Sequence, residues 1–96
     1  MSPLKKKKLN KIRHELDRLD NSLIKLIKKR TNLVKKVLAL KDKKSQIIDQ
    51  KRIKKILKNI RKKSLMNNID PKITNRIWKN MIWSYINFEK RNFKKK

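Results

Sequence analysis

The sequence contains no cysteine, no glycine and a single histidine, His14. Without cysteine the chain cannot form a disulfide, a thiolate nucleophile or a Cys-ligated zinc site. Without glycine it cannot form a Gly-rich phosphate loop or a nucleotide-binding fingerprint, and one histidine cannot supply a histidine cluster for a metal. No apolar run approaches the roughly 20 residues of a membrane span, and no signal-peptide core follows the basic start. We therefore expect a soluble, cytoplasmic protein that uses no metal and no cofactor.

Acidic residues are also scarce, with 7 Asp and Glu against 32 Lys and Arg and a formal net charge of +25. Such a balance is typical of proteins that bind nucleic acid. However, 25 Lys, 13 Ile and 10 Asn make up half of the 96 residues, whereas Ala occurs once. These are the residues of A/T-rich codons, so a biased genome would enrich surface lysine without any anionic partner. We favour this second interpretation of the charge.

The length of 96 residues is enough for one small domain, and no repeat or Ser-rich linker divides it. We predict a single helical domain over 1–96, with a basic start at about 1–8 and a basic tail at 92–96. Ser2 and Pro3 suit the first positions of a helix. The four lysines at 5–8 oppose the helix dipole, and we expect them to fray this end.

Apolar residues recur at alternating steps of three and four, which predicts one long helix with a heptad-like stripe. The stripe positions are Leu9, Ile12, Leu16, Leu19, Leu23, Leu26, Arg30, Leu33, Val37 and Leu40. The period breaks at 43–48, which predicts a loop.

Two shorter helices follow in the pattern. The second carries Ile53, Ile56, Leu57, Ile60 and Leu65, and the third carries Ile73, Ile77, Met81, Tyr85 and Phe88. Asn67 and Asn68 are good residues for a left-handed helix end, and Asp70 before Pro71 is an N-cap followed by a first helical residue. No segment alternates as a strand does, so the predicted fold is all-α with three helices.

The long helix requires a partner. From Leu4 to Lys41 it would be about 57 Å long, whereas a compact chain of this size has a radius of gyration of about 12–13 Å. Two short helices cannot cover so long a stripe. We therefore expect an intertwined two-fold dimer in which the stripe meets its own copy.

One stripe position, Arg30, is wrong for an apolar core, because a buried guanidinium needs an anion. Lys41 lies eleven residues further on, about 20° away in helical phase, so the two cations line one wall. Arg13 is about 25 Å from Arg30 along the helix and would reach the same small ligand only from the other copy of an antiparallel dimer. Arg52 can bring a fourth cation.

Two interpretations of Arg30 stay open at this point. It can pair with an acid such as Asp20 or Glu89, or it can bind a ligand. The four cations together favour a water-poor pocket that binds a small dicarboxylate and stabilises charge on an oxygen during bond reorganisation.

The run IRHELDRLDNSLIKLIKKR at 12–30 resembles the opening helix of the all-helical class of chorismate mutases, in which an Ile/Leu-Arg, a Leu-Asp pair and a closing Arg recur at this spacing. Lys41, the DQKR segment ending in Arg52 and the segment DPKITNRIWKNMIWSYINFE at 70–89 extend the resemblance over nearly the whole chain. The resemblance implies a helical dimer with two shared active sites. It also implies conversion of chorismate to prephenate, a step of aromatic amino-acid biosynthesis, without cofactor or metal.

By position, the resemblance assigns a role to each charged residue. Arg13 of the partner copy would bind one substrate carboxylate and Arg30 the other, with Arg52 assisting. Lys41 would donate to the breaking ether oxygen, and Glu89 would be its third-helix partner there.

Three features depart from the best-known mutases. Ile53 replaces a Glu that binds the substrate hydroxyl, the loop after Lys41 is one residue short, and Tyr85 stands where Ser is common. All three resemble the branch that contains isochorismate pyruvate-lyases and small stand-alone mutases. Asp49 could reach the substrate hydroxyl or cap the second helix, and we favour the cap.

Chorismate mutase is thus the predicted function, and an isochorismate pyruvate-lyase forming salicylate and pyruvate is the alternative. A basic helical dimer that binds nucleic acid is a further alternative, which the sparse aromatic residues disfavour. The last alternative is a regulatory or degenerate relative of the mutases that keeps the dimer but has lost catalytic turnover.

Overall fold

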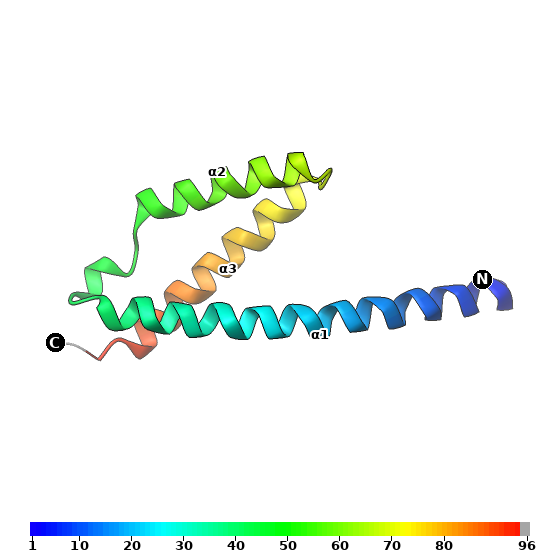
Figure 1. Cartoon of the computed structure of the whole chain (residues 1–96), viewed down its shortest axis with the longest axis horizontal. Coiled ribbons are helices and arrows are strands. Elements are labelled where there is room, and N and C mark those ends of the chain that lie inside the picture. Colours follow the sequence, from blue (N-terminus) through cyan, green and yellow to red (C-terminus); the bar gives the residue numbers. More distant parts are fainter. Residues whose placement is uncertain (95–96) are drawn as a thin grey trace. The chain divides into compact units, whose positions relative to one another are not determined.

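The computed structural model describes residues 1–94. These residues form three α-helices and no strand. Helix α1 is Pro3–Leu40, α2 is Gln50–Met66 and α3 is Pro71–Asn92, with a short 3-10 turn at Lys44–Gln46 before α2 (Figure 1). The prediction of an all-α chain with one very long helix is therefore confirmed. The last part of the predicted basic tail, 95–96, lies outside the described residues.

The chain divides into two compact units, Met1–Leu33 and Val34–Lys96. The first consists of the N-terminal part of α1, and the second contains the end of α1 together with α2 and α3. Each unit is described by itself below, and the predicted single domain over 1–96 stays a prediction.

The start of α1 follows from its first residues. Ser2 accepts a hydrogen bond from the backbone N–H of Lys5 through its hydroxyl, at 3.2 Å, and Pro3 is the first helical residue. These are the predicted N-cap and N1 positions. The lysines at 5–8 lie inside α1, and the expected fraying of this end stays a prediction.

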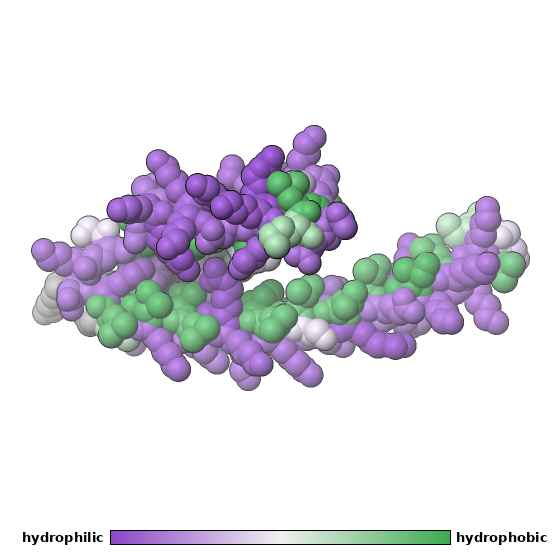
Figure 2. Space-filling model, turned by 45° about the horizontal axis from the view of Figure 1, so that its top comes forward, coloured by the Kyte–Doolittle hydropathy of each residue, from purple (hydrophilic) through white to green (hydrophobic). Residues whose placement is uncertain are grey.

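No residue of α1 is buried within the single chain. The apolar stripe is solvent-exposed, with Leu19 at 60% and Leu40 at 81% of their full accessibility. Its other exposed members include Leu16, Leu23, Leu26, Leu33 and Val37. Figure 2 shows apolar side chains following one another along this helix. The hydrophobic spacing correctly predicts the helix, but no other part of the single chain covers its apolar stripe.

Helices α2 and α3 pack on each other as a hairpin (Figure 1). Asn68 ends α2 with a positive φ of 56°, the left-handed conformation that asparagine tolerates better than most residues. Asp70 then caps α3 by accepting a hydrogen bond from the Lys72 N–H at 2.9 Å. Both predicted helix ends are confirmed.

A small core joins the elements of the second unit. Ile47, Ile82 and Ile86 are buried, and around them pack Leu38, Ile48, Ile53, Ile56, Leu57 and Phe93. At the other end of the hairpin the buried hydroxyl of Ser64 lies 2.6 Å from that of Thr74 and donates to the Ile60 carbonyl at 2.7 Å. These contacts fix α3 against α2 and the end of α1.

Candidate active site

Lys41 and Glu89 meet at the end of α1. The ammonium Nζ of Lys41 lies 3.0 Å from Oε1 of Glu89, and the two residues are 48 positions apart in the chain. Lys41 directly follows α1, and its backbone N–H donates a hydrogen bond to the Leu38 carbonyl at 3.1 Å. Glu89 is only 5% exposed. Because a buried carboxylate without a partner is costly, this contact determines where both side chains lie.

Glu89 is buried because of its position on α3. It follows Ile82 and Ile86 by seven and three residues, so all three side chains share the face of α3 that packs inward. Sequence pattern alone would assign this position to an apolar residue. An acid here is a feature that the core does not need.

The loop after Lys41 is held by Gln46. Its side-chain oxygen accepts hydrogen bonds from the backbone N–H groups of Asp42, at 2.7 Å, and Lys43, at 2.9 Å. The next residue, Ile47, is 3% exposed and anchors the loop in the core. The sequence predicts only a loop here, because the hydrophobic period breaks. The Ile47–Ile48 pair inside a polar stretch is the one signal that could have indicated an anchor.

Asp49 caps α2. Its Oδ1 accepts a hydrogen bond from the Arg52 N–H at 3.0 Å, so the favoured interpretation of this residue is confirmed. Asp49 and Lys41 also line the same cavity, of about 610 Å³. The rest of its wall comes from Val37, Leu40, Gln46, Ile48 and Gln50. The structure thus brings Lys41, Glu89 and Asp49 to one end of the second unit.

For the other predicted site residues of the second unit, the structure gives a position on a helix and a degree of burial. Arg52 is exposed in the first turn of α2, and Tyr85 is half-buried one turn before Glu89 on α3. Ile53 packs against the buried isoleucine core. The position that carries a Glu in the best-known mutases is therefore apolar in its surroundings as well as in its side chain. Substrate roles for Arg52 and Tyr85 stay predictions.

Arg13 and Arg30 belong to the first unit, Met1–Leu33. Arg13 is exposed and Arg30 is half-buried. Both lie on the continuous helix α1, where 17 residues correspond to about 25 Å. One copy of the helix therefore cannot bring both guanidinium groups to a small ligand.

The described chain offers little for other kinds of site. Across residues 1–94 no three of the His, Cys, Asp and Glu side chains gather closely enough to hold a metal ion. None of the helices in this part of the chain is sufficiently long and apolar to cross a membrane.

The chain has a long first helix and a helical hairpin, and Lys41, just after α1, pairs with the buried Glu89 of α3. These features define a class of small all-helical proteins, the one that the sequence resemblance implies. A family model described as chorismate mutase type II matches residues 12–90. The chain belongs to this family and is a chorismate mutase, an isomerase. Searches of curated proteins and of solved structures gave no match.

Proposed function

We propose that this protein converts chorismate to prephenate at a site centred on Lys41 and Glu89. The observation that carries the proposal is the contact of Lys41 with the buried Glu89, with Lys41 Nζ 3.0 Å from Glu89 Oε1. In the rearrangement an ether C–O bond breaks while a C–C bond forms within the same molecule. No group is taken up or released, so the protein needs to supply only orientation and stabilisation of charge.

Lys41 is the donor to the ether oxygen. An ammonium carries three N–H groups, and the bond to Glu89 uses one of them. Negative charge grows on the ether oxygen as its bond to carbon breaks. A fixed cationic donor at that oxygen is stronger in the transition state than in the ground state, which is the requirement for catalysis.

Glu89 has two possible roles that the ion pair supports equally. As a carboxylate it neutralises Lys41 and holds its ammonium group in place. As a protonated acid it donates a second hydrogen bond to the ether oxygen. We assign it the donor role, because the family resemblance places a third-helix partner of the ether oxygen at this position.

The two substrate carboxylates need cations. We assign Arg30 and Arg52 to the carboxylates within one chain and Arg13 to the same site in the other copy. Guanidinium groups suit this role because their planar fork binds a carboxylate with two parallel hydrogen bonds. Asp49 and Tyr85 border the substrate in this proposal, with Asp49 already beside Lys41 in the 610 Å³ cavity.

We further propose that the active unit is a two-fold dimer. The support is the exposed apolar stripe of α1, which no part of a single chain buries. Covering side chains such as Leu19 and Leu26 would gain about 25 cal/mol per Å² of apolar surface. The same association supplies the Arg13 that a single helix cannot bring to Arg30.

One assay tests the proposed function. The purified protein is incubated separately with chorismate and with isochorismate, and prephenate, salicylate and pyruvate are followed. We expect prephenate from chorismate and no salicylate. Salicylate with pyruvate from isochorismate, together with no prephenate from chorismate, would contradict the proposed reaction and favour the lyase alternative.

A further inference from the structure

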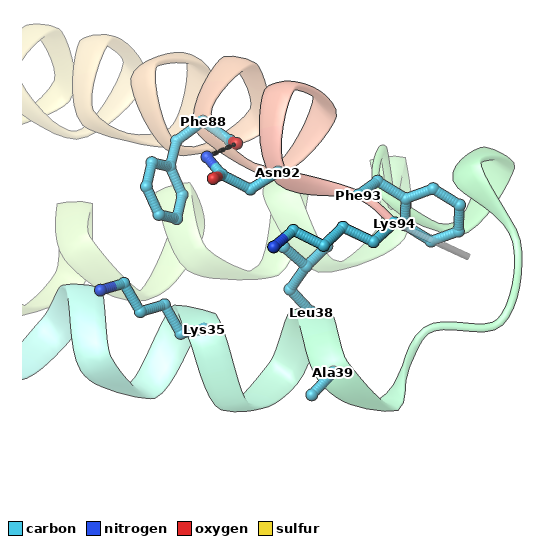
Figure 3. Close-up of a pocket in the computed structure, with 7 residues that line it drawn as sticks. All are labelled: Lys35, Leu38, Ala39, Phe88, Asn92, Phe93 and Lys94. Atoms are coloured by element: carbon cyan, nitrogen blue, oxygen red, sulfur yellow. Dashed lines mark hydrogen bonds between the residues drawn. The ribbon is translucent and has the colours of Figure 1, made fainter.

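A second pocket lies between the end of α1 and the end of α3. Its volume is about 330 Å³, and its wall is formed by Lys35, Leu38, Ala39, Phe88, Asn92, Phe93 and Lys94 (Figure 3). Neither Lys41 nor Glu89 lines it. The proposed reaction therefore does not use this pocket.

The lining combines apolar surface with positive charge. Leu38 and the ring of Phe88 are half-buried, whereas Lys35 and Lys94 are exposed, and no acidic residue is among the wall residues. Lys35 reaches the pocket from α1 and Lys94 from the segment after α3, and Figure 3 draws both side chains at its border. The side-chain amide of Asn92 donates a hydrogen bond to the Phe88 carbonyl at 2.8 Å. The two lysines favour an anionic ligand, and the apolar side chains favour a ligand with an apolar body.

The pocket is also on the side of α1 that the proposed dimer leaves open. Its α1 residues are Lys35, Leu38 and Ala39, and the middle of this set lies about 180° around the helix from the middle of the pair Val37 and Leu40. The latter two belong to the exposed stripe. A partner helix seated on the stripe would not enter the pocket.

We propose that this pocket binds a small aromatic carboxylate. The ring lies against Phe88 and Leu38, and the carboxylate reaches the ammonium groups of Lys35 and Lys94. A single ring on a short chain suits a cavity at the small end of the range for ligand sites, and aromatic rings gain from offset or edge contacts with phenylalanine.

Two short connections join this pocket to the reaction site. The carbonyl oxygen of Leu38 accepts a hydrogen bond from the backbone N–H of Lys41, at 3.1 Å. Phe88 directly precedes Glu89 on α3. A ligand that contacts Leu38 and Phe88 thus touches the neighbours of both members of the pair.

The test measures binding of 3-phenylpropanoate to the whole protein by calorimetry and ligand-observed NMR. We expect a Kd of about 1 mM, typical of a ligand this small. Propanoate lacks the ring and 3-phenylpropan-1-ol lacks the charge, so both should bind several-fold more weakly. Because binding is measured without turnover, the result does not depend on the proposed roles of Lys41 and Glu89.

Paired variants locate the site. Lys35→Gln with Lys94→Gln should weaken binding by about fivefold, the scale of two exposed charge contacts. The control, Lys43→Gln with Lys44→Gln, removes two exposed lysines outside the pocket and should bind as the parent does, with circular dichroism confirming that both variants fold.

Three outcomes would overturn the proposal. The first is the absence of binding up to about 10 mM, well above the expected Kd. The second is equal binding by the two double variants, which would indicate attraction to the overall charge. The third is displacement by chorismate or loss in Arg30→Ala, which would place the ligand in the reaction site.

Discussion

Glu89 is the residue of this chain whose position is best explained by function rather than by packing. An acid at a 5% exposed position of α3 contributes nothing to an isoleucine core, and its contact with Lys41 offsets a burial cost that an apolar residue would avoid. Two proton states give it two roles. The carboxylate serves the ion pair, and the protonated acid serves the reacting oxygen.

The donor role predicts how two substitutions of Glu89 differ. Glu89→Gln supplies a permanent amide donor and should keep most of the parent's kcat/KM, whereas Glu89→Ala removes the donor and should lower kcat/KM by roughly 10²–10³. Initial rates with chorismate give both values, and circular dichroism confirms that both variants fold. Equal losses in the two variants would leave Glu89 with the neutralising role alone.

Lys41 carries the companion prediction. Lys41→Met should lower kcat/KM by roughly 10²–10³, the usual loss when one preorganised donor is removed. It should also destabilise the fold by about 3 kcal/mol or more, because Glu89 would keep a buried charge without this partner. Steady-state rates and urea unfolding measure the two effects.

The control for this variant is Lys43→Met, two residues away and exposed. It should match the parent in rate and stability. Equal losses in the two variants would show that Lys41 has no special place in the site.

At the scale of elements, the helix ends were the most predictable features. The ends at Ser2–Pro3, Asn67–Asn68 and Asp70–Pro71 depend on the few residues beside them, and the structure has all three. Capping is a local interaction, so local sequence contains the information needed to predict it.

Contacts between elements were not predictable in the same way. The 41–46 loop depends on Gln46, and the hairpin depends on the Ser64–Thr74 hydroxyl pair. Polar residues in a loop or at a helix end have many possible partners, and only the packed chain selects one. The Lys41–Glu89 contact spans 48 positions, and the sequence indicated it through family resemblance rather than through any periodicity.

Asn68 gives a prediction for the α2–α3 hairpin. Its φ of 56° is left-handed, so Asn68→Ala should destabilise the protein by about 1 kcal/mol. Asn68→Gly should be neutral or slightly stabilising, since glycine has no Cβ. Urea unfolding of both variants, beside Asn59→Ala in the exposed middle of α2, measures the difference. Equal stability of the Ala and Gly variants would contradict the left-handed turn.

For the whole molecule, the exposed stripe of α1 predicts association. Stability should rise with protein concentration, because unfolding of a dimer releases two chains. Sedimentation should give a dimer at micromolar concentration, and Leu26→Asp should shift it towards unfolded or monomeric chains. Asn21→Asp makes the same change of charge at an exposed position off the stripe and should leave the dimer intact. A folded monomer of the parent at micromolar concentration would contradict the shared site.

The shared site is the central claim, and mixing two inactive variants tests it most directly. Arg13→Ala and Arg30→Ala should each lose most mutase activity. In a heterodimer of the two, one site would contain both substitutions and the other would contain neither. After subunit exchange, confirmed by mass spectrometry, the mixture should recover about one quarter of the parent activity, because half of the dimers then hold one intact site. A mixture no more active than its two parents, with heterodimers present, would show that Arg13 and Arg30 do not act together across two chains.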